Sequence, residues 1–218
     1  MTQNILVILP HPDDEAFGLS GTLAKYISEG ARVTYACLTL GEMGRNMGIP
    51  PFANRVTLPA IRALELEESC KAIGIQDVRK LGYHDKTIEF EDKDALDADI
   101  LSLIREVRPE IVFTFYPGHS VHPDHDATGA AVVRTISRLP KEERPIVRCI
   151  AFSKNKDEAI GKPDVHVDIR GFLKQKLASI QAHRSQFQAA ELLGKGKNAK
   201  KEMESRFGNE SFYTYRFD

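Results

Sequence analysis

Short apolar runs alternate with helical patterns along most of the chain, and this alternation limits the fold more than any other feature of the sequence. Residues 5–9 form a continuous, β-branched run that stops at a proline, which is typical of a strand buried on both faces. Residues 93–108 carry apolar side chains at helical spacing. Because parallel strands need crossover connections, we predict an α/β fold with a doubly wound, mainly parallel, Rossmann-like sheet and helices on both faces.

The same patterns predict the other elements, and all of them fit a single domain spanning residues 1–218. We expect further strands at residues 32–40, 77–81, 110–115 and 146–152, and a late edge strand at 211–217. We expect further helices at residues 17–29, 57–74, 124–137 and 171–188. Residues 194–201 are rich in Gly and Lys and are expected to form a mobile loop.

Composition argues against several classes of protein. Lys and Arg total 30 and Asp and Glu total 31, so the net charge of −1 provides no field that attracts nucleic acid or an anionic membrane surface. No stretch approaches the roughly 20 apolar residues that cross a bilayer, and the first residues lack the pattern of a secretory signal. We therefore expect neither nucleic acid nor a membrane as a partner, while the near-neutral charge permits a homo-oligomer.

The cysteines indicate the redox compartment. Cys37, Cys70 and Cys149 are far apart, odd in number and embedded in apolar runs. This usage favours buried thiols over disulfides or a Cys-based metal site. We expect a protein of the reducing cytoplasm.

The strand at residues 5–9 leads directly into His11, Asp13, Asp14 and Glu15. Core packing gives no reason to place an imidazole and three carboxyl groups where a buried strand becomes a loop. One aspartate could cap the helix that follows, but the neighbouring His and Glu favour a chemical role. In doubly wound sheets, ligands bind beyond the carboxyl ends of the strands, which is where this cluster lies.

A second polar cluster follows the strand predicted at residues 110–115. It contains His119, His122, Asp124 and His125, so three of the seven histidines fall within seven residues. Both clusters lie at carboxyl ends of strands, so the fold can bring them together. Their combination predicts a metal or catalytic site.

Imidazole and carboxylate ligands suit Zn²⁺ in an open catalytic site, and a set of two His and one carboxylate also suits Fe²⁺, so the sequence leaves the ion open. An ion with a free coordination position lowers the pKa of its water to about 7. The Asp and His side chains that are not needed as ligands are then candidates for general base and general acid.

These residues also leave other classes of function open. Asp and His sites serve metal-dependent phosphoesterases, although the Gly-rich residues 41–48 match neither a phosphate-binding loop nor a dinucleotide fingerprint and are better explained as a mobile active-site loop. A noncatalytic sugar-binding or metal-binding module is a third class. The surplus Asp13 and His122 count against it, because binding alone needs no spare proton carriers.

The ordered motifs resemble a known family. HPDDE at residues 11–15 and HPDH at residues 122–125 resemble the paired signatures of the PIG-L/LmbE-like N-acetylglucosaminyl deacetylases. The resemblance extends through residues 39–42, the predicted helix with Arg62 and Glu65, and residues 183–186. Size and motif context are most similar to the bacterial members that remove acetyl from N-acetylglucosaminyl-malate in bacillithiol biosynthesis.

This resemblance implies a zinc-dependent N-deacetylase, with Fe²⁺ as the other candidate ion, acting on an acetylated amino sugar. It implies that His11, Asp14 and His125 are the metal ligands. It implies that Asp13 is the general base that takes a proton from water. Within the family, hydrolysis of the amide of a thiol conjugate and deacetylation of another acetylated sugar are alternatives, and the aglycone of the sugar stays open.

Further roles follow from the same resemblance. His122 would stabilise the oxyanion or protonate the leaving amine, with Asp124 orienting it. Glu42, Arg62 and Asp85 are candidate substrate-binding residues.

The remaining histidines and one departure from the family pattern complete the sequence assignments. His183 could support the site or serve as an ordinary core or cap residue, and His84, His119 and His166 are expected to be structural or solvent-facing. Some relatives carry a tyrosine where this chain has Ser120, which argues against a mechanism that needs an aromatic hydroxyl there.

Overall fold

The strands form one sheet in the computed structural model, which describes residues 2–188 and 199–217. The strand order is β3-β2-β1-β4-β5-β7-β6. The strands β1 to β5 pair with one another in parallel, whereas β7 is antiparallel to both β5 and β6. The bounds are β1 (Asn4–Leu9), β2 (Arg32–Cys37), β3 (Asp77–Lys80), β4 (Ile111–Phe115), β5 (Ile146–Ile150), β6 (Val165–Asp168) and β7 (Asn209–Thr214).

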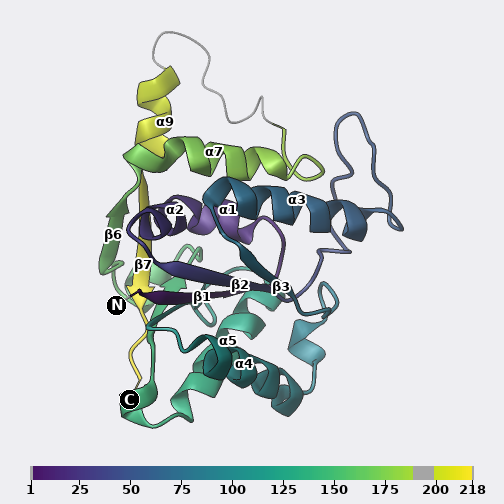
Figure 1. Ribbon diagram of the computed structural model, residues 1–218. Helices are drawn as coiled ribbons and strands as arrows, with labels where there is room; N and C mark the ends of the chain where they lie inside the picture. The colour runs from purple at the N-terminus through teal and green to yellow at the C-terminus, as the bar shows by residue number, and fades with distance from the viewer. Residues whose placement is uncertain (1, 189–198, 218) are drawn as a thin grey trace.

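Helices cover both faces of the sheet, as predicted (Figure 1). The α-helices are α1 (Asp14–Gly18), α2 (Ser20–Ser28), α3 (Leu58–Ile73), α4 (Lys93–Val107), α5 (Pro123–Ser137), α6 (Lys156–Ala159), α7 (Leu173–Ala182) and α9 (Ala199–Phe207). Short 3-10 turns lie at η1 (Ile88–Phe90), η2 (Lys141–Glu143) and η3 (Arg170–Phe172). The predicted doubly wound α/β fold is confirmed.

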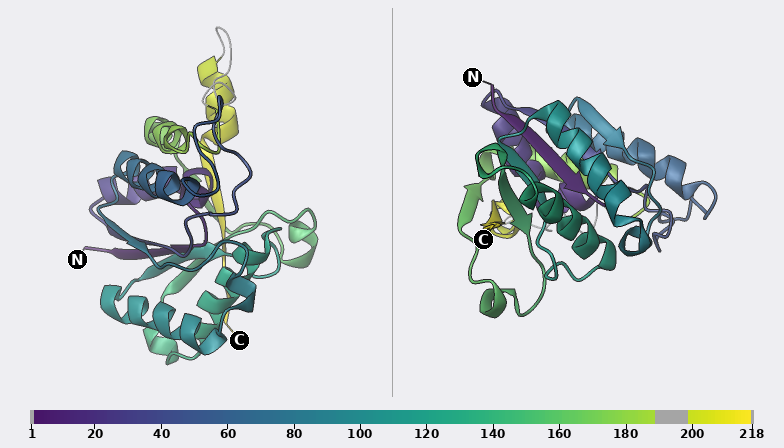
Figure 2. Two further views of the ribbon diagram at one scale, coloured as in Figure 1. Left: turned by 90° about the vertical axis from the view of Figure 1, so that its right-hand side faces the viewer. Right: turned by 90° about the horizontal axis from the view of Figure 1, so that it is seen from below.

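Each central strand supplies both halves of the core, because its side chains alternate between the two faces. Ile5, Val7 and Leu9 pack against α2 and α3, whereas Leu6 and Ile8 pack against α4 and α5. The two helical layers stay on opposite sides of the sheet in the side view (Figure 2). Burial on both faces explains why the strand reads as an unbroken apolar run.

The strand order places the topological switch point between β1 and β4. From β1 the chain proceeds to β2 and β3 on one side, and β4 returns to pair with the other side of β1. Loops that leave β1 and β4 therefore diverge and open a crevice beyond the carboxyl ends of these strands. The HPDDE and HPDH motifs occupy these two loops.

The helix predicted at residues 17–29 is wrong in its bounds and continuity. It begins earlier, at Asp14, and breaks at Leu19, whose φ of −153° is not helical. Gly18 precedes the break and weakens the helix there. Gly18 also lies so close to β5 that a Cβ would come within 2.6 Å of the Ile150 side chain.

The late strand is β7, and it is not an edge strand. It lies between β5 and a short outer strand, β6, that the sequence analysis missed. The missed strand is only four residues long, and His166 and Asp168 in it are exposed, so it lacks an apolar run.

The helix predicted at residues 171–188 is too long. Its α-helical part, α7, ends at Ala182, and His183 leaves the helical region with ψ 57°. The cause is a tertiary contact, because the backbone N–H and the hydroxyl of Ser185 both donate to the buried Glu65 carboxylate at 2.7 Å.

The loop predicted at residues 194–201 falls mostly on residues 189–198, outside the described residues. Residues 199–201 belong to α9 rather than to a loop. Among residues 2–188 and 199–217, no helix has both the length and the apolar character needed to cross a membrane.

Candidate active site

A cleft of about 330 Å³ lies at the carboxyl ends of the parallel strands. The sequence predicts nine residues for catalysis, metal binding or substrate binding, and the cleft brings eight of them together. Seven line the cleft, and Asp124 contacts the lining residue His11. The ninth, Glu42, is described below. The lining residues are His11, Asp13, Asp14, Met43, Gly44, Arg45, Arg62, Asp85, Lys86, His122 and His125.

The surroundings of His11 fix the proton on its ring. Its Nε2 lies 3.1 Å from Asp124 Oδ2 and 3.2 Å from Asp85 Oδ1. Ionised carboxylates only accept hydrogen bonds, so Nε2 carries a proton, and Nδ1 is the nitrogen that can bind a cation once it is deprotonated. Burial by itself lowers the pKa of His11, but hydrogen bonds to the surrounding carboxylates outweigh burial and raise it well above its usual value.

His125 presents the matching lone pair from the other loop. Its Nδ1 lies 3.2 Å from the backbone oxygen of Ser120, which can only accept, so Nδ1 carries the proton. Its ring stacks on Phe115, the last residue of β4, with centroids 3.9 Å apart and planes 6° apart. The rotamer of His125 is thereby set by the end of a central strand.

Three electron-pair donors converge between the two loops. His11 Nδ1 and His125 Nε2 are 3.2 Å apart, and the Asp14 carboxylate oxygens lie 3.5 Å and 3.2 Å from them. Ligands of a tetrahedral Zn²⁺ at about 2.0–2.1 Å stand about 3.3 Å from one another. Burial would raise the pKa of Asp14, but the adjacent imidazoles His125 and His11 hold it well below its usual range. The donor set therefore fits a cation.

Two further sets of donors lie within 4.8 Å of one another in the described residues, namely His11 with His122 and His125, and His11 with Asp85 and Asp124. Both fit a metal ion less well. The Nδ1 of His122 accepts the backbone N–H of Asp124 at 3.2 Å. The Asp124 carboxylate already accepts hydrogen bonds from backbone N–H groups, as described below.

Asp13 sits beside these donors in a constrained backbone conformation, with φ 109°. Its N–H donates to Glu15 Oε2 at 3.0 Å, and its carboxylate accepts from Arg62 Nη2 at 3.0 Å. Burial raises the pKa of Asp13 to about 6, against the opposing effect of the Arg62 guanidinium. A positive φ at a residue other than glycine persists only where its surroundings hold it, and such residues concentrate at functional sites.

His122 and Asp124 open α5. His122 is the N-cap, and its ring is fixed by the backbone N–H of Asp124 rather than by the Asp124 carboxylate. The carboxylate, which is fully buried, faces His11 and accepts the N–H groups of Lys86 and Ile88 at 2.6 Å and 3.3 Å. Burial, together with the nearby His11 and His125, lowers the pKa of His122.

The three candidate substrate-binding residues differ in position. Arg62 and Asp85 line the cleft and are buried, so Arg62 is not a surface residue. Glu42 is half-buried behind Asp85, and its Oε2 accepts the Asp85 N–H at 3.1 Å. Asp85 Oδ2 in turn accepts the N–H of Met43 at 2.9 Å. These reciprocal bonds join the loops that follow β2 and β3.

Glu15 and His183 form a buried pair that the sequence does not predict. Glu15 Oε1 lies 2.7 Å from His183 Nε2 and accepts the Ser69 hydroxyl at 2.5 Å, and both members of the pair are fully buried. Burial opposes the charge on each group, but their mutual attraction lowers the pKa of Glu15 and raises that of His183. The pair anchors the HPDDE loop, because Glu15 in that loop contacts Ser69 of α3 and His183 at the end of α7. The sequence carries two separate signals, an acidic residue inside the motif and His183 as a residue that could support the site, but nothing that pairs them.

The other three histidines do not line the cleft and are solvent-facing or structural, as the sequence predicts. His84 and His166 are exposed, and His119 Nδ1 pairs with the Ser153 hydroxyl at 3.0 Å. The cysteines are free and buried, also as predicted.

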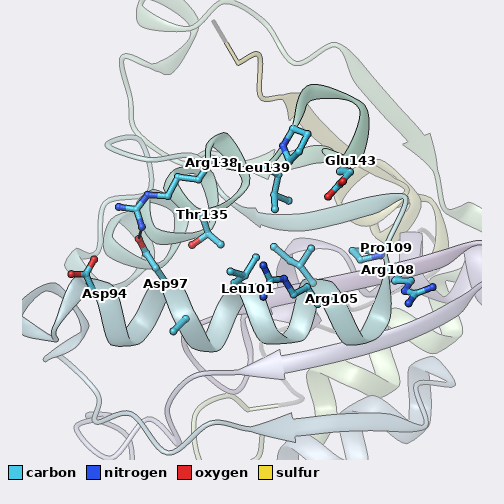
Figure 3. A pocket seen from close by; sticks show the side chains of 13 residues that line it. Asp94, Asp97, Leu101, Arg105, Arg108, Pro109, Thr135, Arg138, Leu139 and Glu143 are labelled. Carbon is cyan, nitrogen blue, oxygen red and sulfur yellow. Dashed lines mark ion pairs between the residues drawn. The ribbon is translucent and has the colours of Figure 1, made fainter.

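A larger groove, of about 1050 Å³, lies between α4 and α5 (Figure 3). Its residues Arg108 and Pro109 precede β4, so it is at the amino ends of the strands, away from the metal-fitting donors. Its buried Asp97 is neutralised by Arg134 and Arg138. The groove lacks histidine and does not form part of the candidate active site.

Comparisons with known proteins show the family to which the chain belongs. The chain is 48% identical over 220 residues to the probable N-acetyl-alpha-D-glucosaminyl L-malate deacetylase 2 of Bacillus cereus, and 48% identical over 221 residues to the protein of that name in Bacillus subtilis, with 100% of each chain covered. The solved N,N'-diacetylchitobiose deacetylase of Pyrococcus horikoshii superposes with a TM-score of 0.71 and 26% identity, over 97% of this chain and 82% of that one. Residues 6–136 match the profile described as PIG-L, GlcNAc-PI de-N-acetylase. The chain belongs to the PIG-L family.

Proposed function

We propose that the protein is a metal-dependent deacetylase that hydrolyses the N-acetyl group of N-acetylglucosaminyl-malate, releasing acetate and a free amine. The Bacillus relatives, which match over their full length, carry this substrate in their names. One observation carries the chemistry. His11 Nδ1, His125 Nε2 and the Asp14 carboxylate converge at 3.2–3.5 Å, and the other nitrogen of each imidazole is hydrogen-bonded to an acceptor, which is the arrangement of a cation site with two His ligands and one carboxylate.

In this proposal His11, Asp14 and His125 hold the ion, with Zn²⁺ as the first candidate and Fe²⁺ as the second. The Nε2–H of His11 donates to Asp124, which fixes the tautomer that leaves Nδ1 free. The Nδ1–H of His125 donates to the backbone oxygen of Ser120, which leaves Nε2 of His125 free. When bound, such an ion acts as a Lewis acid on the acetamide carbonyl and on the attacking water.

Asp13 acts as the general base. It lies beside Asp14 in the cleft but takes its own hydrogen bond from Arg62, so it is free of the ligand set. Water adds to the carbonyl carbon while Asp13 accepts its proton. The Arg62 guanidinium, which also donates to the backbone oxygens of Pro12 and Gly41, keeps the carboxylate in place.

His122 stabilises the oxyanion, and the proton that Asp13 took from water passes to the nitrogen as the C–N bond breaks. The Nδ1 of His122 is occupied by the Asp124 N–H, so Nε2 is the atom available to the substrate. Asp124 thus positions His122 through its backbone and His11 through its carboxylate. Glu42 contributes by holding the loop that carries Asp85.

We place the protein in the cytoplasm in this proposal. Its cysteines, Cys37, Cys70 and Cys149, are all free and buried, which suits a reducing compartment.

Acetate release from N-acetylglucosaminyl-malate, with N-acetylglucosamine and diacetylchitobiose as comparison substrates, tests the proposal. We expect the highest kcat/KM for the malate conjugate. Faster hydrolysis of diacetylchitobiose would assign a different sugar, and release of phosphate from a generic phosphate ester without acetate release would refute the deacetylase.

The identity of the ion is tested on protein stripped with a chelator. Activity should disappear and return on addition of Zn²⁺ or Fe²⁺ under anaerobic conditions, and the ion that restores full kcat at one equivalent is the functional one. Full activity in verified metal-free protein would refute the metal centre.

A further inference from the structure

We propose that Arg45 and Lys86 form an anion-binding subsite that takes the carboxylates of the substrate's aglycone. This inference rests on the proposed function, because it names the part of the cleft that recognises malate. It assigns the preference for a negatively charged aglycone to two residues outside the HPDDE and HPDH motifs.

The charges around the cleft single out these two cations. The Arg62 guanidinium donates hydrogen bonds to Asp13 and to backbone oxygens, and the nearby Arg55 guanidinium donates to the backbone oxygens of Glu42 and Gly44. Arg45 and Lys86 also line the cleft, yet within residues 2–188 and 199–217 neither side chain makes a hydrogen bond or an ion pair. Both residues are exposed, so their charges can meet a ligand from solvent.

The backbone beside each cation is hydrogen-bonded to other segments, including in residues 41–48, for which the sequence predicts a mobile loop. Lys86 has φ 68°, and its N–H donates to the buried Asp124 carboxylate at 2.6 Å. On either side of Arg45, the oxygen of Gly44 accepts from Arg55, and Asn46 exchanges two hydrogen bonds with Gln186 at 2.9 Å and 3.1 Å. A prearranged backbone lowers the ordering cost of binding.

The two cations come from two loops that are joined to each other. They belong to the loops after β2 and β3, which the bonds between Glu42, Met43 and Asp85 hold together. The donors that fit the metal come instead from the loops after β1 and β4. An acetamide held at those donors therefore leaves the rest of the substrate to extend toward Arg45 and Lys86 within a cleft of about 330 Å³.

Charge complementarity selects the ligand class. Malate joined to a sugar through its hydroxyl carries two free carboxylates, and two cations without protein partners match them. The cleft otherwise presents the acids Asp13, Asp14 and Asp85, which disfavour an anion there. A neutral aglycone would gain nothing from Arg45 and Lys86.

The test compares two substrates, N-acetylglucosaminyl-malate and N-acetylglucosaminyl-glycerol, whose aglycone is uncharged. The preference for malate, expressed as the ratio of kcat/KM values, should fall about tenfold in Arg45→Gln and in Lys86→Gln, equivalent to about 1.4 kcal/mol each, and further in the double variant. Arg32→Gln and Lys141→Gln change exposed cations at the other end of the sheet and should leave the ratio unchanged. If kcat/KM falls equally for both substrates, or does not fall for either, the proposed subsite is wrong.

Two further measurements separate a charge effect from a structural one. Lys86→Arg should keep the preference for malate, whereas loss of the preference in this variant would contradict a role for charge. Added salt should raise KM for the malate conjugate in the wild type and have little effect in the double variant, because these exposed charges are screened.

Failure of the proposed function is distinguishable from failure of this inference. If the wild type releases acetate from neither substrate, the proposed function is wrong. The subsite is then decided by NMR titration with free L-malate. Binding to the wild type that is lost in the Arg45→Gln/Lys86→Gln double variant supports it, and equal binding to both, or no binding to the wild type, overturns it.

Discussion

Replacement of Asp124 by asparagine tests whether a buried carboxylate behind the candidate ligands controls metal affinity. The Asp124 side chain is fully buried, and its oxygens accept hydrogen bonds from three donors, His11 Nε2–H and the N–H groups of Lys86 and Ile88. An amide has one acceptor oxygen, so Asp124→Asn turns its NH₂ group toward at least one of these donors. The cost of such a buried mismatch is about 1–3 kcal/mol in the free energy of unfolding.

The effect on the metal is separate from this loss of stability. A neutral amide makes His11 a weaker ligand and no longer enforces its tautomer. Loss of a carboxylate behind a metal-binding histidine typically lowers metal affinity about 10–100-fold, which corresponds to about 1.4–2.7 kcal/mol. Competition with a chromophoric chelator measures this affinity, and urea unfolding of the metal-free protein measures stability.

Asp97→Asn is the matched control. Asp97 is also a buried aspartate, but it pairs with Arg134 and Arg138 in the groove between α4 and α5. We expect Asp97→Asn to lower stability while leaving metal affinity unchanged. If Asp124→Asn binds the ion as tightly as the wild type does, the assignment of His11 Nδ1 as a ligand supported by Asp124 is refuted.

Three further substitutions probe the other parts of the site. Asp13→Ala should retain the metal, as measured by elemental analysis, and lower kcat about 10²–10⁴-fold; wild-type turnover with metal present would exclude the general base. Gly41→Ala places a Cβ 1.9 Å from the Arg62 guanidinium at a φ of 64°. Urea unfolding should show a loss of about 1–2 kcal/mol in the free energy of unfolding from the left-handed backbone alone. The kcat should also fall, and an unchanged kcat would show that Arg62 does not position the base. Glu15→Gln removes the charge that pairs with His183 and should lower stability by about 3–5 kcal/mol; an unchanged melting temperature would contradict a structural role for the pair.

The sequence predicted the fold and the location of the candidate site for a common physical reason. A strand buried on both faces must be apolar throughout, so the polar HPDDE segment after residues 5–9 marked the end of β1. The histidines after residues 111–115 marked the end of β4 in the same way. Parallel strands end at one edge of the sheet, which is why His11 and His125 could be expected to meet although they are 114 residues apart.

Other features depend on tertiary partners that local patterns do not contain. The end of α7 at Ala182 depends on Ser185 binding Glu65, and the conformation of Asp13 depends on Glu15, which is itself held by His183. Each of these partners is a buried polar residue. In the sequence alone, a buried polar residue cannot be told from a polar residue at the surface. The place of β7 inside the sheet was equally hidden, because its outer neighbour β6 is only four residues long and carries little apolar signal.

In the proposed function, the chemistry of the site and the recognition of the aglycone belong to different loops. The metal-fitting donors of β1 and β4 are locked by buried contacts, with Asp124 behind His11 and Phe115 and Ser120 behind His125, so a change at any of them disturbs several hydrogen bonds or ring contacts at once. Arg45 and Lys86 are exposed, and within the described residues their side chains bond to nothing, so either can be exchanged without moving a ligand. A single metal centre can therefore serve substrates with different aglycones when only the loops after β2 and β3 change. The malate preference ratio should then respond to these two side chains while metal affinity stays constant.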